Sequence, residues 1–239
     1  MQDLIVGAGA VGIGVGSALL AAGRDVGVVA RGAVGERLRL DGVSRSGLFG
    51  EHSFPGARIQ VLGATQECEV TPDRVIVAVK STGSGAVAHE IAACPALADA
   101  SVPIVLLQNG LGNAEHFVAR FPQERVWTGV VITGFHLRRP THVEITAHAA
   151  PIKLGSLFGG DPDVVAPLAQ AIDRGGIPCI TVPHIERDLW AKVLYNASLN
   201  PLGALLDVPY GVLAERPETR AILDAVMDEV FDVMRADGA

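Results

Sequence analysis

The spacing of three glycines near the N-terminus limits what this chain can fold into more than any other feature. Gly7, Gly9 and Gly12 stand between an apolar strand pattern at residues 2–6 and a helical pattern that leads to a second apolar strand at 26–30. A strand, a glycine turn, a helix and a strand within about thirty residues make up a βαβ unit. We therefore expect the chain to begin with a dinucleotide-binding type of fold.

Each glycine of this turn has its own physical role. The first permits the tight turn, the second lets the backbone approach a pyrophosphate, and the third lets the helix pack closely on the strand. The N–H groups at the start of the helix then face the phosphates. A glycine-rich helix start without a ligand is the alternative. We expect cofactor binding by the whole turn: Gly7, Ala8, Gly9, Ala10, Val11 and Gly12.

Residues 4–23 carry no charge, and by length alone they would suit a membrane span or a signal peptide. Six of these twenty residues are glycine, and Asp3 precedes them without a basic segment. We therefore expect no membrane association.

Strand and helix patterns alternate along the next part of the chain. Buried strands are predicted at 74–79 and 103–107, strands with more alternation at 125–132 and 142–146, and a last strand at 177–182. Helices are predicted over 83–95, from the end of segment 108–113 to about 120, and from 161 to about 174. The two alternating strands suit a mixed or antiparallel edge. The pattern predicts an α/β, Rossmann-like domain with a mostly parallel sheet and helices on both faces.

Beyond residue 184 only helices are expected. One is predicted over 186–199, with a break at Asn200-Pro201 because proline disfavours helix at the residue before it, and another over about 217–235.

This change of pattern predicts a Rossmann domain over 1–184 and a short all-α domain over 185–239 for substrate binding or dimerisation, incomplete at its C-terminus. So few residues cannot form an independent core. They must pack on the first domain, on a second subunit or on residues outside this chain, and an exposed apolar face would favour a homodimer.

Charge and cysteine content exclude several classes of function. The formal net charge is −7, which argues against nucleic-acid binding because such affinity depends on a basic surface. Cys68, Cys94 and Cys179 are odd in number and widely spaced, as expected of a cytoplasmic protein without a zinc site. The seven histidines form no HxxxH or HxH pair near acids, so we expect no metal, and no GxSxG nucleophile motif occurs.

Three polar residues follow strands at the carboxyl edge of the expected sheet, where ligands of open α/β folds bind. Arg31 stands at the end of the second strand, where an acid would indicate NAD. Its guanidinium suits a 2′-phosphate instead, so we expect NADP(H). A plain surface charge is the alternative. Lys80 and Asn109 each follow a later strand, where a lysine could face an anionic substrate or a cofactor phosphate.

A polar stripe marks the first helix of the C-terminal part. Lys192, Asn196 and Asn200 are four residues apart, so they share one helix face among largely apolar neighbours. Such residues need partners when buried. Spacing alone leaves a functional site and a structural polar network equally open.

Taken together, these motifs resemble the ketopantoate reductase (2-dehydropantoate 2-reductase) family. The resemblance rests on the glycine turn at 7–12, Arg31, the strand that ends at Lys80, Gln-Asn-Gly-Leu-Gly-Asn at 108–113 and Leu-Trp-Ala-Lys-Val…Asn…Asn-Pro at 189–201. It implies a Rossmann domain, an all-α domain and NADPH-dependent reduction of ketopantoate to pantoate, a step towards pantothenate and coenzyme A.

The resemblance also implies a role for each candidate residue. Lys192 would be the general acid that protonates the carbonyl oxygen as hydride arrives from the nicotinamide. Asn109 would hold the nicotinamide end of the cofactor and the catalytic network. Asn196 and Asn200 would bind the substrate, and Lys80 would line the cleft near cofactor and substrate.

The chain departs from the family in two respects. It stops at Ala239, before the family's carboxylate-binding serine and the glutamate near the catalytic lysine, and another glutamate is missing after Pro209-Tyr210-Gly211. Two alternatives stay open: a reductase of another 2-oxo acid, and an NADP(H)-binding module without turnover.

Overall fold

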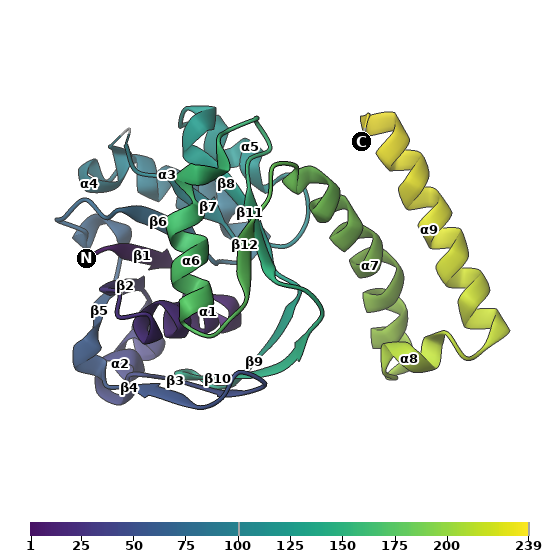
Figure 1. Ribbon diagram of the computed structural model, residues 1–239, viewed down its shortest axis with the longest axis horizontal. Coiled ribbons are helices and arrows are strands. Elements are labelled where there is room, and N and C mark those ends of the chain that lie inside the picture. The colour runs from purple at the N-terminus through teal and green to yellow at the C-terminus, as the bar shows by residue number, and fades with distance from the viewer. Residues whose placement is uncertain (100, 239) are drawn as a thin grey trace. The chain divides into compact units, whose positions relative to one another are not determined.

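The computed structural model describes residues 1–99 and 101–238, and the chain divides into two compact units (Figure 1). The first, Met1–Ile185, mixes strands and helices, and the second, Glu186–Ala239, contains helices among its described residues. The division lies next to the expected boundary at residue 184. The predicted fold class, an α/β domain followed by a helical domain, is confirmed.

An eight-stranded sheet forms the centre of the first unit, in the order β12-β11-β8-β7-β6-β1-β2-β5. Its strands are β1 (Asp3–Val6), β2 (Val26–Val29), β5 (Ile59–Leu62), β6 (Arg74–Val77), β7 (Ile104–Leu106), β8 (Val126–Val130), β11 (Ile152–Gly155) and β12 (Cys179–Thr181). Every pairing is parallel except that of β8 with β11. The chain moves outward from β1 through β2 to β5, and from β6 on the other side through β7 to β8. The order therefore reverses between β1 and β6, which is where open α/β sheets bind ligands.

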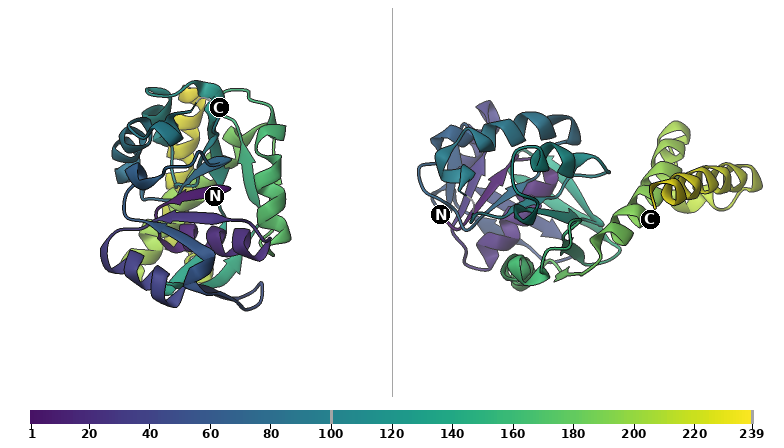
Figure 2. Two further views of the ribbon diagram at one scale, coloured as in Figure 1. Left: turned by 90° about the vertical axis from the view of Figure 1, so that its left-hand side faces the viewer. Right: turned by 90° about the horizontal axis from the view of Figure 1, so that it is seen from above.

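Helices cover both faces of this sheet (Figure 2). They are α1 (Ala10–Ala21), α2 (Gly32–Asp41), α3 (Ser84–Ala92), α4 (Pro95–Ala98), α5 (Asn113–Val118) and α6 (Ala166–Arg174), with short 3₁₀ turns at Gly56–Arg58, Thr65–Glu67, Ser81–Gly83, Gln123–Arg125 and Pro162–Val164. Adjacent strand residues point to opposite faces, so Ile5 joins the core with α1 and α6, whereas Leu4 and Val6 join the core with α3, α4 and α5.

The helix predicted over 83–95 is shorter in the structure. It ends at Ala92, and a separate one-turn helix begins at Pro95. Cys94 before the proline is extended, because the proline ring disfavours a helical backbone at the residue that precedes it. A proline is tolerated in the first turn of a helix, where its missing N–H has no acceptor to lose.

A second sheet, which the sequence did not predict, lies against α1 (Figure 1). Its order is β4-β3-β10-β9, formed by β3 (Val43–Gly47), β4 (His52–Phe54), β9 (Thr133–Arg139) and β10 (His142–His148). The strand expected at 142–146 belongs here rather than to the edge of the main sheet. The strand β8 is parallel to β7 and antiparallel to β11, so the mixed pairing expected at 125–132 is confirmed.

The second sheet explains why residues 4–23 carry no charge. The helix α1 lies between the main sheet and the second sheet, and its residues from Gly12 to Leu20 are all buried. Phe135 of β9 packs so closely on Gly14 that an added Cβ would overlap its ring. A helix that is apolar all round is buried on all sides. No helix within residues 1–99 and 101–238 is both long and apolar enough to cross a membrane.

Arg45 shows why the second sheet escapes a search for apolar strands. It lies in β3 and is 1% exposed, and its Nη2 donates a hydrogen bond of 2.9 Å to the carbonyl of Gly175, the residue that ends α6. A cation is favourable at the C-terminus of a helix. Burial lowers the pKa of this guanidinium.

The described part of the second unit contains α7 (Ile185–Leu206), whose first residue belongs to the first unit, α8 (Tyr210–Leu213) and α9 (Pro217–Asp237). The predicted break at Asn200-Pro201 is wrong, because α7 continues through Pro201. Tyr210 bridges this point: its hydroxyl donates to Asn200 Oδ1 at 2.5 Å, and its ring packs against Gly203. Tyr210 thus contacts α7 on both sides of Pro201 and supports the helix where the missing N–H of the proline would weaken it.

We expect Gly175→Ala to lower the free energy of unfolding by about 2 kcal/mol, measured by denaturant titration. Gly175 ends α6 where it meets α1, and an added Cβ would overlap the backbone carbonyl of Ala18. Neither helix can move without disturbing the core between them.

Gly85→Ala is the matched control. Its added Cβ would lie 3.4 Å from the His116 ring, an ordinary contact, and alanine favours the helix in which Gly85 lies. Equal unfolding midpoints for the two variants would contradict the close approach of α1 and α6.

Candidate functional site

The glycine turn is shaped by two close approaches and one open space. Gly7 has a φ of +113°, and an added Cβ there would lie 2.9 Å from the backbone nitrogen of Val79. An added Cβ at Gly12 would overlap the carbonyl oxygen of Gly7. At Gly9 the nearest atom to an added Cβ is the Ala78 carbonyl oxygen, 4.0 Å away. Gly7 and Gly12 therefore allow tight packing, whereas Gly9 leaves space above the turn.

Two clefts adjoin this turn, one on each side. The first, of about 390 Å³, is lined by Val6, Gly7, Ala8, Val29, Ala30, Arg31, Val34, Val79, Gly83, Val87 and Glu90. The second, of about 330 Å³, is lined by Gly9, Ala10, Val11, Ala78, Val79, Lys80, Ser81, Leu107, Gln108 and Asn109. The structure thus places Arg31 beside the first cleft, and Lys80 and Asn109 beside the second. Gly12 lines neither cleft and lies beneath the turn.

Arg31 sits at the adenosine side of the expected site and is not alone there. It follows β2 and precedes α2, and its Nη2 lies 2.7 Å from Glu90 Oε1. Glu90 belongs to α3, and sequence reasoning missed it because nothing in the pattern of an amphipathic helix indicates which distant loop its side chains meet.

A buried hydrogen-bond network supports the loop that carries Asn109. Gln108 Nε2 donates to Ser84 Oγ, and Ser84 Oγ donates to Asn113 Oδ1, both at 2.8 Å. Asn113 Nδ2 donates to the carbonyls of Asn109 and Gly110, each at 3.1 Å. The network joins the starts of α3 and α5 to the loop after β7. Ser84 was not among the predicted site residues, because its role depends on the fold.

The first unit fits a dinucleotide. The glycine turn lies where the strand order reverses, between β1 and β6, and the first turn of α1 offers backbone N–H groups that have no acceptor within the helix. No acid lies in that first turn. The two clefts provide space on either side for the two halves of such a ligand, with Arg31 beside one and Asn109 beside the other.

The remaining predicted residues lie on α7 in the second unit. Lys192 is 8% exposed, and burial lowers the pKa of its ammonium to about 8. Asn200 Nδ2 donates to Asn196 Oδ1 at 3.3 Å, and Tyr210 donates to Asn200. Hydrogen bonds thus link the two asparagines on one face of α7 to Tyr210 of α8.

The predicted residues therefore fall into two groups, one in each unit. Around the clefts of the first unit lie the glycine turn, Arg31, Lys80 and Asn109, and on α7 lie Lys192, Asn196 and Asn200. Among the described residues, no group of three or more His, Cys, Asp or Glu side chains is placed to hold a metal ion. The role of each residue stays a prediction.

Comparison with known proteins identifies the family. The family described as ketopantoate reductase PanE/ApbA matches residues 4–159, and its C-terminal domain matches residues 184–239. A 2-dehydropantoate 2-reductase of Aquifex aeolicus is 33% identical over 236 residues, which are 98% of this chain and 72% of that protein.

Solved structures agree with this assignment. A crystal structure of 2-dehydropantoate 2-reductase from Geobacter metallireducens has a TM-score of 0.85 and 28% identity, over 96% of this chain and 74% of that one. A ternary structure of D-mandelate dehydrogenase with NADH and anilino(oxo)acetate shares the fold, with a TM-score of 0.86 and 20% identity over 100% of this chain and 75% of that one. The chain belongs to the ketopantoate reductase family, oxidoreductases that act on 2-oxo acids.

Proposed function

We propose that the chain catalyses the NADPH-dependent reduction of 2-dehydropantoate to pantoate. The observation that carries the proposal is the pair of clefts beside one glycine turn, with Arg31 at one and Lys80 and Asn109 at the other. This arrangement suits a dinucleotide with a phosphorylated ribose at one end and the reaction at the other. Family membership supports reduction of a 2-oxo acid.

Arg31 supports the choice of NADP(H). Its guanidinium can bind a 2′-phosphate through two hydrogen bonds, and the strand β2 ends without an acid that would bind a 2′-hydroxyl. The D-mandelate dehydrogenase structure that shares this fold contains NADH, so we expect a nicotinamide cofactor for this chain as well.

Lys192 is the proposed general acid. The reduced nicotinamide, when bound, supplies a hydride to the substrate carbonyl. Negative charge then develops on the carbonyl oxygen, and the Lys192 ammonium stabilises that charge and donates a proton to the oxygen. A pKa of about 8 suits this role, because a general acid works best when its pKa lies near the working pH.

The other predicted residues bind and orient. The Asn109 side chain holds the nicotinamide end, on a loop fixed by the network of Ser84 and Asn113. The amides of Asn196 and Asn200 bind the hydroxyl and carboxylate side of the substrate, and Lys80 lines the cleft near cofactor and substrate.

We also expect the protein to work in the cytoplasm. Cys68, Cys94 and Cys179 are free and buried, and burial raises the pKa of the Cys179 thiol to about 12. Thiols of this kind are inert and suit a reducing compartment. Homodimer formation stays a prediction.

The decisive assay follows the loss of NADPH absorbance when ketopantoate is added to the purified chain, with NADH and other 2-oxo acids in parallel. Turnover that prefers NADPH and ketopantoate would support the proposal. Turnover with another acid would support the first alternative, and cofactor binding without any turnover would support a binding module.

Lys192→Ala should lower kcat by at least about a hundredfold, because the variant has no ammonium to protonate the carbonyl oxygen. Steady-state kinetics measure this change. Thermal stabilisation by NADPH serves as the control, since the glycine turn and Arg31 remain. Full kcat in the variant would rule out the role of Lys192.

The pH dependence provides a separate test of Lys192. The acid is active while protonated, so kcat/KM should be constant well below pH 8 and fall as the pH rises through about 8. If Lys192 had an ordinary pKa, kcat/KM would stay constant up to a pH of about 10. A profile that stays flat from pH 7 to about 10 would contradict the lowered pKa.

Gly9→Val should abolish NADPH binding without unfolding the protein. Its side chain would occupy the open space above the turn, and the extended backbone of Gly9 suits valine. We expect an unchanged melting temperature without ligand and no shift when NADPH is added. Gly12→Ala is the contrasting variant, since its overlap with Gly7 should lower stability even without ligand.

A further inference from the structure

We propose that Glu90 is a specificity-determining residue that weakens the preference for NADPH over NADH by acting on the same guanidinium as the 2′-phosphate. This inference rests on the proposed function, because it concerns the cofactor's adenosine ribose. It accounts for a charged pair that the proposed function leaves unexplained.

The pair joins two elements on either side of β1. Arg31 follows β2, which neighbours β1 on one side, whereas Glu90 lies in α3, which follows β6 on the other side. Both residues line the cleft of about 390 Å³ together with Gly7 and Ala8 of the glycine turn. The 2.7 Å contact between Arg31 and Glu90 therefore spans the cleft in which the adenosine half would bind.

The rest of this cleft offers no competing charge. Apart from Arg31 and Glu90, its described lining consists of glycine, alanine and valine residues. The selection between a phosphate and a hydroxyl on the ribose thus falls to these two side chains.

The two members of this surface ion pair differ in exposure. The side chain of Arg31 is 68% exposed and that of Glu90 is 24% exposed. The carboxylate is therefore the better shielded member, and its field in the cleft is less screened by salt than that of an exposed acid. Arg31 keeps enough free surface to meet a ligand.

NADPH and NADH would interact differently with the Arg31–Glu90 ion pair. A 2′-phosphate carries nearly two negative charges and must share the Arg31 guanidinium with the Glu90 carboxylate, which repels it. A 2′-hydroxyl has no such charge, and a carboxylate is the group that commonly accepts its hydrogen bond in dinucleotide-binding folds. Glu90 thus provides from α3 the acid that the end of β2 lacks.

Removal of the Glu90 charge should shift the preference towards NADPH. For Glu90→Gln we expect the ratio of the NADH Kd to the NADPH Kd to rise by about fivefold, the size of an exposed charge interaction. Nicotinamide fluorescence titrations of the full chain measure both constants without turnover. Displacement by 2′,5′-ADP and by 5′-AMP should show the same shift, which would locate the effect at the ribose.

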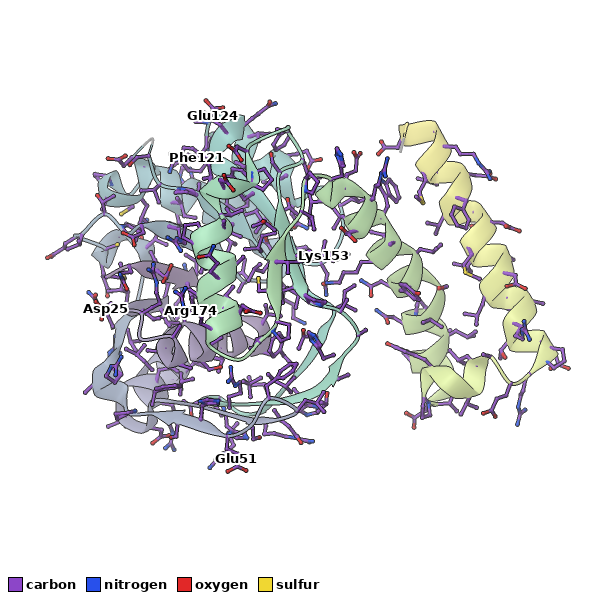
Figure 3. All side chains as sticks on the ribbon, in the orientation of Figure 1. Asp25, Glu51, Phe121, Glu124, Lys153 and Arg174 are labelled. Atoms are coloured by element: carbon purple, nitrogen blue, oxygen red, sulfur yellow. The ribbon has the colours of Figure 1, made fainter. Side chains whose placement is uncertain are left out.

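Glu124→Gln is the matched control. It removes the same charge from an exposed site outside both clefts, labelled in Figure 3, and should leave the ratio unchanged. It therefore accounts for any general effect of net charge on anion binding.

Three outcomes would overturn the inference. A ratio that changes by less than about twofold in Glu90→Gln would remove the role of the Glu90 charge. An equal loss of affinity for both cofactors would show that Glu90 only supports the fold. If the unsubstituted chain binds none of the four ligands, the proposed function fails and the role of Glu90 fails with it. The first two results concern only the Glu90→Gln variant and do not contradict cofactor binding by the unsubstituted chain.

Discussion

The close approach of α1 to the turn before it is the contact on which the rest of the first unit depends. A carbonyl oxygen of Gly7 occupies the space in which any side chain at position 12 would lie. This contact sets the direction of α1, which in turn supports two sheets, one on each side. The same contact brings the first N–H groups of α1 to the carboxyl edge of β1. The fold and the candidate binding site therefore share one steric requirement.

The sequence predicts the parts of this fold that are buried on both faces. After a charged first residue, strands such as β1 and β6 are apolar runs, since helices cover both sides of them, and the glycine spacing joins β1 to β2 in a βαβ unit. The second sheet has no such signal, because its strands are partly exposed and include the buried Arg45, whose partner is a helix end far along the chain. The course of α7 through Pro201 depends likewise on Tyr210, which a local rule for proline does not consider.

The residues of the candidate site likewise separate into those that the sequence predicts and those that only the fold reveals. Residues at strand ends, such as Arg31, Lys80 and Asn109, are predictable since parallel strands end at one edge. Glu90 and Ser84 are not, because each acts on a loop that only the folded chain brings near. The family comparison adds the chemistry, which no spacing of residues states by itself.

The network of Gln108, Ser84 and Asn113 has a consequence for the thermodynamics of binding. Its hydrogen bonds hold the backbone of Asn109 and Gly110 within the protein itself, before any ligand is present. The conformational entropy of this loop is thus lost when the chain folds. A ligand that arrives later meets a rigid loop, so ordering of that segment takes little from its affinity. Preorganisation of this kind favours fast, selective binding over binding that requires the loop to change its conformation.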